Sequence, residues 1–371
     1  MPDGDRRLRI LHLTAGSDAG GVSRYIHDLS AAMHANGHAV AIAGEHGAWH
    51  GLFENVPWPW VDVPLKGNLA DLIRATRTLR RFIRDFAPDV IHAHYRRATL
   101  VGERLQMRGR PTLLYTLHLS HFDFGRMGRW FTTFGDHVHV PSEDGRQWLT
   151  HLGRVPAERT TLIPHGIDTE KFPITLDADR RAARRALGLT DDVTIGTYVG
   201  RYDDPKNEGW LLDLAERSRA ALPQLHLLLA GGGPHEAELR DRIARERLGD
   251  RVTLLGHHDP LPIYRAADAM LLPSAREGFS LACAEAMSTG LPVLRTRTAG
   301  TRELIVEGET GRSVPVDRDA FINGAISFLG DRPELARTGR LAATHVRQHF
   351  TFERQVQETV KLYRRLCGAA R

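Results

Sequence analysis

The chain has 371 residues, a length that favours two domains, and 42% of its residues are hydrophobic, which is enough for two buried cores. The sequence pI is near 9.4 but the net charge is only +5, so the distribution of charge carries more information than its total. No run approaches 18 uncharged apolar residues and the first nine residues are polar, which argues against a transmembrane helix or signal peptide and predicts a cytoplasmic chain.

The first half of the sequence alternates between short apolar runs and helical patterns. We expect strands at residues 8–14, 40–43, 90–94, 112–117 and 137–140. The opening is a strand, a glycine-containing loop over residues 16–21, and a helix over residues 22–35. This alternation is typical of a parallel sheet covered by helices.

A basic segment interrupts this pattern. Residues 65–130 hold thirteen basic and five acidic side chains, and apolar residues recur at helical spacing over residues 69–86. Two interpretations stay open for this amphipathic helix: an ordinary crossover helix with a charged outer face, or a helix that contacts an anionic membrane surface. Nucleic acid is disfavoured, because no aromatic-interleaved motif accompanies the charge. The helix carries five arginines: Arg74, Arg77, Arg80, Arg81 and Arg84.

A second alternating array follows, with strands expected at residues 194–199, 226–229, 252–254, 269–272 and 292–295. Pro164, Gly166 and Pro173 break the periodicity between the two arrays. The expected fold class is therefore α/β, with two Rossmann-like doubly wound domains that bind ligand at the carboxyl ends of their strands. We expect domains over residues 1–170 and 171–350, and a last helix over residues 351–371 that packs back toward the first domain.

Two carboxylates, Glu277 and Glu285, lie eight residues apart across a loop followed by a helix start. Eight residues are slightly more than two helical turns, so both carboxylates point roughly the same way. Ser280 occupies the position of an N-cap, and the amides of residues 279–282 would face a phosphate. The carboxylates can accept hydrogen bonds from hydroxyl groups, and the amides can donate to phosphate. A nucleoside diphosphate sugar is a ligand that needs both. The alternative is a surface helix with two solvated glutamates.

Three other loops follow strands of the same arrays. Gly20 and Gly21 let the backbone approach a ligand, although they do not form the GxGxxG dinucleotide fingerprint. Arg201 and Lys206 emerge together after a strand and suit a diphosphate. Residues 231–234 form a loop with almost no side chains, where a base or ribose could lie. Each loop alone also fits an ordinary turn; their occurrence together favours a nucleotide-sugar site.

With these loops, the chain resembles the retaining, nucleotide-sugar-dependent glycosyltransferases of family 4, group 1, over essentially its whole length. The resemblance implies the GT-B architecture, in which two Rossmann-like domains face each other across a donor/acceptor cleft. The matching pieces are the Gly20-Gly21 loop, residues 163–168, Gly200-Arg201 with Lys206-Asn207, residues 231–234, residues 277–285, and residues 299–303 with Gly308 and Gly311. Glycine is more usual than Asn207 and Glu208 in related loops.

The resemblance also implies residue roles. For the donor diphosphate these residues are Gly20, Gly21, Arg201, Lys206, Ser280 and Leu281; for the nucleoside and ribose, Gly231, Gly232 and Glu285; for the donor sugar, Glu277, Gly278 and Phe279. Glu277 and His118 are the expected catalytic residues. His118 follows the strand at residues 113–117 and is expected to face the donor sugar and acceptor, with His121 as its rival. His94 and His165 are expected to support the cleft.

The implied activity is transfer of a hexose, with retention, from a UDP- or GDP-linked sugar to an acceptor hydroxyl in polysaccharide, glycolipid or glycoconjugate biosynthesis. Sugar or lipid-linked acceptors and an anionic membrane surface are the expected partners, at the inner face of the cell membrane. We expect no metal, because the sequence has no HExxH motif and Cys283 and Cys367 lack metal-ligand spacing. A nucleotide-sugar 2-epimerase-like enzyme and an inactive nucleotide-sugar-binding protein remain as alternatives.

Overall fold

The computed structural model describes residues 6–18, 20–106, 111–121 and 132–369. The chain divides into two units: residues 1–164 with 355–371 form unit 1, and residues 165–354 form unit 2. The second junction, between residues 354 and 355, falls inside the last helix. Each unit is an α/β domain with a parallel sheet, which confirms the predicted fold class. Among the described helices, none combines the length and apolar character needed to span a membrane.

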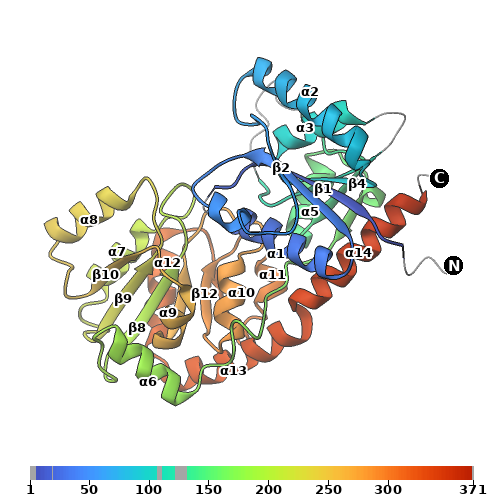
Figure 1. Ribbon diagram of the computed structural model, residues 1–371. Helices are drawn as coiled ribbons and strands as arrows, with labels where there is room; N and C mark the ends of the chain where they lie inside the picture. The colour runs from blue at the N-terminus through green and yellow to red at the C-terminus, as the bar shows by residue number, and fades with distance from the viewer. Residues whose placement is uncertain (1–5, 19, 107–110, 122–131, 370–371) are drawn as a thin grey trace. The chain divides into compact units, whose positions relative to one another are not determined.

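Unit 1 contains a seven-stranded parallel sheet in the order β3-β2-β1-β4-β5-β6-β7 (Figure 1). Its strands are β1 (Arg9–Gly16), β2 (Ala39–Glu45), β3 (Trp60–Asp62), β4 (Val90–Ala93), β5 (Thr112–Thr116), β6 (His137–Val140) and β7 (Thr160–Leu162). Its helices are α1 (Gly21–Ala35), η2 (His50–Phe53), α2 (Leu69–Phe86), α3 (Arg96–Leu105), α5 (Glu143–His151) and η3 (Ala157–Arg159).

Unit 2 contains a six-stranded parallel sheet in the order β10-β9-β8-β11-β12-β13 (Figure 1). Its strands are β8 (Thr194–Val199), β9 (Leu225–Ala230), β10 (Val252–Gly256), β11 (Ala269–Leu272), β12 (Val293–Thr296) and β13 (Gly311–Val314). Its helices are α6 (Asp177–Ala186), α7 (Gly209–Arg217), α8 (Glu236–Arg245), α9 (Pro260–Ala266), α10 (Leu281–Ser288), α11 (Thr301–Leu304), α12 (Arg318–Leu329) and α13 (Arg332–His349), while α14 (Phe352–Ala369) crosses the junction.

The central strands match their expected positions to within two residues, but three strands were missed. β3, β7 and β13 lie at sheet edges and have only three or four residues each. The residues of β3 and β7 are at most half-buried, and β13 reads Gly-Arg-Ser-Val, so none shows the continuous apolar run of a strand buried on both faces. Edge strands of this kind are assigned by pairing with a neighbour rather than by their own composition.

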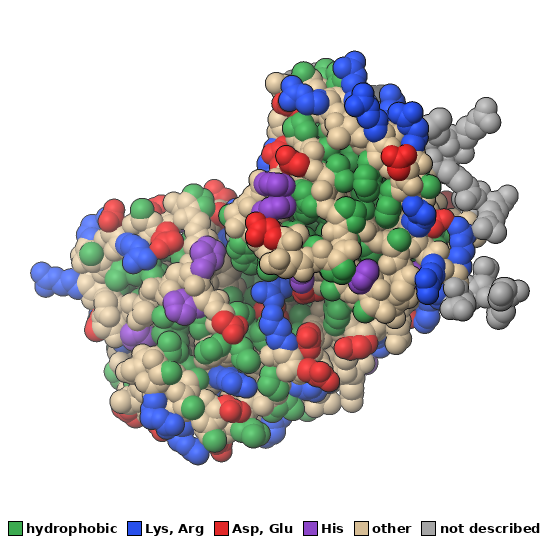
Figure 2. All heavy atoms as spheres, in the orientation of Figure 1, with side chains coloured by type: hydrophobic (Ala, Val, Ile, Leu, Met, Phe, Trp, Pro, Cys, Tyr) green, Lys and Arg blue, Asp and Glu red, His purple; other side chains and the backbone are tan. Residues whose placement is uncertain are grey.

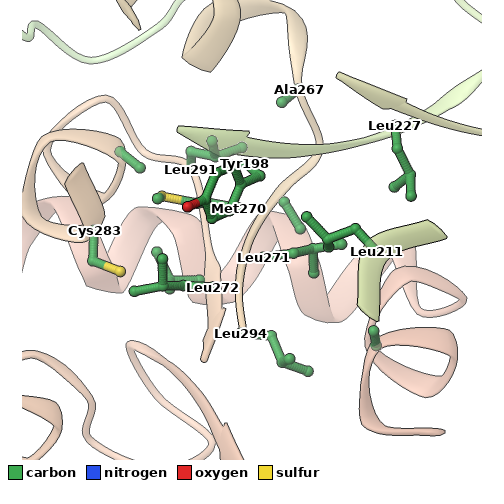
Figure 3. Packing of buried hydrophobic residues seen from close by; sticks show 14 of the residues in the cluster. Tyr198, Leu211, Leu227, Ala267, Met270, Leu271, Leu272, Cys283, Leu291 and Leu294 are labelled. Carbon is green, nitrogen blue, oxygen red and sulfur yellow. The ribbon is translucent and has the colours of Figure 1, made fainter. Parts of the chain in front are cut away.

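The core of unit 2 fixes the base of the loops discussed below. Tyr198 of β8, Leu271 of β11 and Leu294 of β12 are completely buried, and helices α7 and α10 contribute Leu211 and Cys283 to the same cluster (Figure 3). Close packing from several strands and helices leaves little freedom for the strand ends. The loops at the carboxyl edge therefore start from fixed positions.

Each sheet reverses its strand order at one point, between β1 and β4 in unit 1 and between β8 and β11 in unit 2. In open parallel sheets, such a switch point leaves a crevice at the carboxyl ends of the two strands, where ligands bind. The loop after β8 carries Arg201 and Lys206, and the loop after β11 carries Glu277. Three of the sequence-predicted residues of unit 2 thus lie in the two loops beside this switch point.

Gly231 is required by packing within the fold. Its φ of +145° is a conformation that side chains rarely adopt, and a Cβ atom added there would lie 1.8 Å from the carbonyl oxygen of Gly200. The amide of Gly231 also donates to Gly256 O at 2.8 Å, so three strand-end loops meet at this residue. The glycine allows this close approach of main chains whether or not a ribose binds nearby.

Substituting Gly231 tests this explanation. We expect Gly231→Ala to lower the free energy of unfolding by about 2 kcal/mol or more, because both the backbone conformation and the contact with Gly200 become unfavourable. Gly249→Ala is the matched control, since a Cβ there meets nothing within 4 Å. Urea unfolding of the two variants without ligand provides the measurement, and equal stability of the two would show that Gly231 is not needed for the fold.

Candidate functional site

The centre of the site in unit 2 is an ion pair between Lys206 and Glu277. Lys206 Nζ lies 2.8 Å from Glu277 Oε1, and the Ser274 hydroxyl donates to the same oxygen at 2.6 Å. Glu277 is only 7% exposed. Two residues that are 71 positions apart in the sequence are therefore in direct contact beneath the carboxyl edge of the sheet.

Two further contacts hold the loop after β8 against the loop after β11. The amide of Ala275 donates to Pro205 O at 2.7 Å, and the Asn207 side chain donates to Pro273 O at 3.0 Å. Asn207 has a φ of 52°, in the left-handed region that asparagine tolerates better than most residues. Asparagine is therefore tolerated at this position, and its side-chain amide adds a contact that glycine could not make.

The environment of Glu277 keeps its carboxylate charged. Burial raises its pKa, but the charges of Lys206 and Arg295 and the hydrogen bonds from Lys206 and Ser274 together outweigh burial, so the pKa lies below its ordinary value. An ionised carboxylate only accepts hydrogen bonds. Glu277 is therefore suited to bind the hydroxyl groups of a ligand.

Arg295 was missed by the sequence analysis as a member of this site. It lies in β12, is completely buried, and donates to Phe279 O at 3.3 Å, Thr298 Oγ1 at 2.8 Å and Ala299 O at 3.1 Å. Its guanidinium fixes the main chain of the segment that follows Glu277 and attracts the Glu277 carboxylate. The sequence feature that could have identified it is an arginine at the end of an otherwise apolar predicted strand. A buried arginine needs several hydrogen-bond acceptors, so it indicates a polar site around it.

Helix α10 begins beside this pair, as the sequence predicted. Ser280 is the N-cap residue, and its hydroxyl accepts a hydrogen bond from the amide of Cys283 at 3.4 Å. The amides of Leu281 and Ala282 belong to the first turn and have no acceptor within the helix. No acidic side chain lies in that turn, so the positive end of the helix dipole is not neutralised. The start of α10 is thus suited to a phosphate group.

The remaining predicted residues of unit 2 have other partners. Arg201 is mostly exposed and its guanidinium lies 2.6 Å from Asp203, while Glu285 is half-buried and accepts from the Tyr264 hydroxyl at 3.2 Å. The ring of Phe279 is buried against other aromatic rings, so only the main chain at this position could meet a sugar. Gly278 lies in the same buried segment. Gly232 is also buried, and a Cβ atom added there would lie 2.8 Å from His257 Nε2.

In unit 1, Gly20 and Gly21 begin helix α1. Gly20 has a φ of 145°, and no acidic side chain lies in the first turn of the helix. Of the two candidate histidines, His118 is half-buried just after β5, with Nε2 3.1 Å from His94 Nδ1. His121 is exposed and its Nδ1 lies 2.8 Å from the Ser120 hydroxyl. His118 is thus joined to a buried group, whereas the described contacts of His121 are with its neighbour Ser120 and with the ring of Trp148, 6.0 Å away between centroids.

That buried group consists of five histidines that the sequence analysis did not bring together: His12, His92, His94, His118 and His139. They come from β1, β4, β6 and the ends of β4 and β5. Burial lowers the pKa of all five, to about 3 for His12 and His118 and to about 4 for His139, so the rings are neutral at pH 7. The sequence feature that could have identified this group is a pair of His-x-His repeats, at residues 92–94 and 137–139. Alternate residues of a strand face the same side, so each repeat places two histidines together.

Two family models match the chain. The model described as Glycosyltransferase Family 4 matches residues 19–171, and the model described as Glycosyl transferases group 1 matches residues 194–331. The first match contains most of the sheet of unit 1, and the second contains all strands of unit 2.

Curated relatives and solved structures agree with these matches. The lipopolysaccharide core biosynthesis mannosyltransferase LpsB of Rhizobium meliloti is 33% identical over 56% of this chain and 61% of its own length. A D-inositol 3-phosphate glycosyltransferase of Geodermatophilus obscurus is 29% identical over 74% of this chain and 66% of its own length. The chain thus spans about two thirds or less of these relatives.

Among solved structures, HepE of Anabaena in complex with UDP and glucose aligns with a TM-score of 0.83 at 23% identity, covering 96% of this chain and 99% of that one. Sucrose-phosphate synthase of Thermosynechococcus elongatus aligns with a TM-score of 0.82 at 25% identity, covering 98% of this chain and all of that one. These similarities extend over both units and concern the fold.

The lowered pKa of Glu277 gives a pH-dependent prediction. Because the folded-state pKa is below the unfolded value, the carboxylate stabilises the fold above the unfolded value of 4.5, and this contribution is lost as the pH falls through the folded value. We expect Glu277→Gln to be about 1–3 kcal/mol less stable than the natural chain at pH 7. The difference should narrow below about pH 4.5.

Urea unfolding at a series of pH values provides the measurement. Glu238→Gln, on an exposed position of α8, is the control for loss of one negative charge. A gap between Glu277→Gln and the natural chain that stays constant down to pH 3 would contradict the depressed pKa.

Proposed function

Because the chain belongs to glycosyltransferase family 4, we propose that it transfers a hexose from a UDP- or GDP-linked sugar to an acceptor hydroxyl. The observation that carries this proposal is the pair of Lys206 with the buried Glu277 beside the start of α10, whose first turn holds no acidic side chain. The carboxylate offers acceptors for sugar hydroxyls, and the ammonium and helix amides offer donors for phosphate. A nucleoside diphosphate sugar needs both, at adjacent positions.

Lys206 serves both parts of such a donor. An ammonium group has three N–H donors. One of them contacts Glu277, and a second could donate to a phosphate oxygen. The leaving nucleoside diphosphate gains negative charge in the transition state, and a fixed cation together with the first-turn amides of α10 stabilises that charge. Arg201 adds a second cation when its guanidinium turns from Asp203 to the diphosphate.

We propose that this charge stabilisation makes a divalent metal unnecessary and that the sugar is transferred with retention. In the part of the chain that the structure describes, the one group of side chains with metal-binding geometry is His12, His92 and His94 of unit 1, not a group in the loops of unit 2. Retention follows a front-face displacement in which the leaving phosphate accepts the proton of the acceptor hydroxyl. An inverted product or a covalent glycosyl-enzyme would refute this course.

A donor screen tests the proposal. Thermal unfolding with UDP-, GDP- and ADP-sugars, each with and without EDTA, should show stabilisation by one nucleotide class, about 2.7 kcal/mol at 100 times Kd, unchanged by EDTA. Glu285→Ala should lose most of this stabilisation, because Glu285 is the proposed ribose ligand, whereas Glu238→Ala on exposed α8 should keep it. Absence of stabilisation by every donor would overturn the proposed function and leave the fold unaffected.

We further propose that the chain acts in the cytoplasm at the inner membrane surface, in polysaccharide or glycolipid biosynthesis. Figure 2 shows lysine and arginine side chains gathered on unit 1 where Figure 1 places α2. The five arginines of α2 are exposed, and Leu69 and Ile73 of the same helix are 67% and 45% exposed. Exposed arginines beside exposed apolar side chains suit the headgroups of anionic lipids. The names of the relatives, which include lipopolysaccharide core synthesis and inositol phosphate glycosylation, support an anionic acceptor.

Vesicle binding tests this location. We expect the purified chain to sediment with vesicles containing anionic phospholipid at low salt, and to be released as salt rises. Arg77→Glu with Arg81→Glu should weaken binding at least tenfold, because each basic residue contributes about 1 kcal/mol near an anionic surface. Arg181→Glu with Arg185→Glu on α6 of unit 2 makes the same charge change and should leave binding within about twofold. Equal losses in the two variants would show that net charge, not α2, drives the association.

A further inference from the structure

Arg295 of unit 2 is a buried cation whose hydrogen-bond partners are all neutral. Its side chain is completely buried, and its guanidinium donates to Phe279 O, Thr298 Oγ1 and Ala299 O. No carboxylate forms an ion pair with it among the described residues, and its Nε is buried there without a hydrogen-bond partner. A buried charge is costly unless an opposite charge compensates it. The charge of Arg295 is therefore only partly compensated by the fold.

The carboxylate on which Arg295 acts is already paired with another cation. Lys206 Nζ lies 2.8 Å from Glu277 Oε1, whereas Arg295 attracts the same carboxylate without an ion-pair contact. One negative charge is thus shared by two positive charges. Counted together, Lys206, Glu277 and Arg295 carry an excess of one positive charge. We call these three side chains the charged triad.

The charged triad acts on the first turn of α10. Burial raises the pKa of the Cys283 thiol in this turn, and the positive charge of Arg295 opposes that effect more strongly than Lys206 does. The guanidinium of Arg295 also donates to Phe279 O, one residue before the N-cap Ser280. The uncompensated cation therefore lies close to the helix start that the proposed function assigns to a phosphate group.

We propose that Arg295 is a third cation of the phosphate site, one that acts through its charge and not by contact with the ligand. The anion that the ligand brings balances the excess positive charge of the triad. For the ligand class this inference rests on the proposed function, in which that anion is a diphosphate. Arg201 is mostly exposed, so water and salt screen its charge, whereas the buried charge of Arg295 is screened much less. Arg295 thus favours anionic ligands over neutral ones.

The same contacts also give Arg295 a bracing role. Its guanidinium joins the main chain at Phe279 to the loop at residues 298–299. These two segments touch directly at Gly300, where an added Cβ atom would lie 2.5 Å from Phe279 Cα. Removing the whole side chain would release both segments as well as the charge. Substitutions must therefore separate loss of charge from loss of contacts.

Two substitutions of Arg295 make this separation. Arg295→Gln removes the charge but keeps an amide donor, whereas Arg295→Lys keeps the charge and loses most of the hydrogen bonds. The probe is inorganic pyrophosphate, titrated in a calorimeter at low ionic strength. We expect Arg295→Gln to weaken binding about tenfold or more and Arg295→Lys about threefold or less. Equal losses in the two variants, or full affinity in Arg295→Gln, would overturn the proposal.

Arg297→Gln is the matched control for net charge. Arg297 lies two residues further along, is exposed, and donates to the Ser313 hydroxyl at 3.3 Å. Its charge is screened by solvent, so we expect pyrophosphate affinity within about twofold of the natural chain. A loss as large as that of Arg295→Gln would show that overall charge, and not the buried cation, sets the affinity.

Thr298 allows a second test that leaves Arg295 in place, and it decides the matter if Arg295→Gln does not fold. The Thr298 hydroxyl accepts from the guanidinium at 2.8 Å, so Thr298→Asp gives Arg295 a carboxylate partner and removes the excess charge. We expect this variant to bind pyrophosphate about tenfold more weakly, and Thr298→Asn, which adds no charge, to bind within about threefold. Equal affinities of the Asp and Asn variants would overturn the proposal.

Pyrophosphate carries neither a base nor a sugar, so these titrations are independent of the donor screen. Binding that depends on Arg295, without stabilisation by any nucleotide sugar, would support the charged site and overturn the transferase proposal. Stabilisation by a donor, with unchanged pyrophosphate affinity in Arg295→Gln, would support the transferase and overturn the role of Arg295. Absence of pyrophosphate binding to the natural chain at millimolar concentration would also overturn that role.

Discussion

The burial of one carboxylate constrains much of unit 2. An ionised group as buried as Glu277 costs several kcal/mol unless opposite charges and hydrogen bonds compensate it. Lys206 from the loop after β8, Ser274 from the loop after β11 and Arg295 from β12 supply that compensation. Three strand ends are therefore held in one arrangement around a single charge. The groups that would meet a ligand are ordered before it arrives, which lowers the cost of binding and of reaching the transition state.

The two units organise their polar centres by different means. Unit 2 uses full charges, and its geometry depends on their balance around Glu277. Unit 1 uses neutral imidazoles, whose geometry depends on the direction of each hydrogen bond. Burial keeps those rings uncharged well below neutral pH, so the direction of the bonds does not change across the physiological range.

The sequence predicted the parts of this structure that depend on local pattern. The buried strands were found from their apolar runs, and the start of α10 from Ser280 ahead of an apolar helix. The loops after β8 and β11 were assigned to one edge because parallel strands end together. Contacts set by register and long-range packing were not predictable: the hydrogen bond from the Tyr264 hydroxyl to Glu285, and the hydrogen bond from the Arg295 guanidinium to Phe279 O. Each depends on where two distant segments settle.

The buried histidines of unit 1 show a second limit of sequence reasoning. The sequence places His118 after a strand and names His121 as a rival, but neither spacing nor composition says what lies behind either ring. The structure separates them, because His118 alone continues into β1 and β4 through His94 and His12.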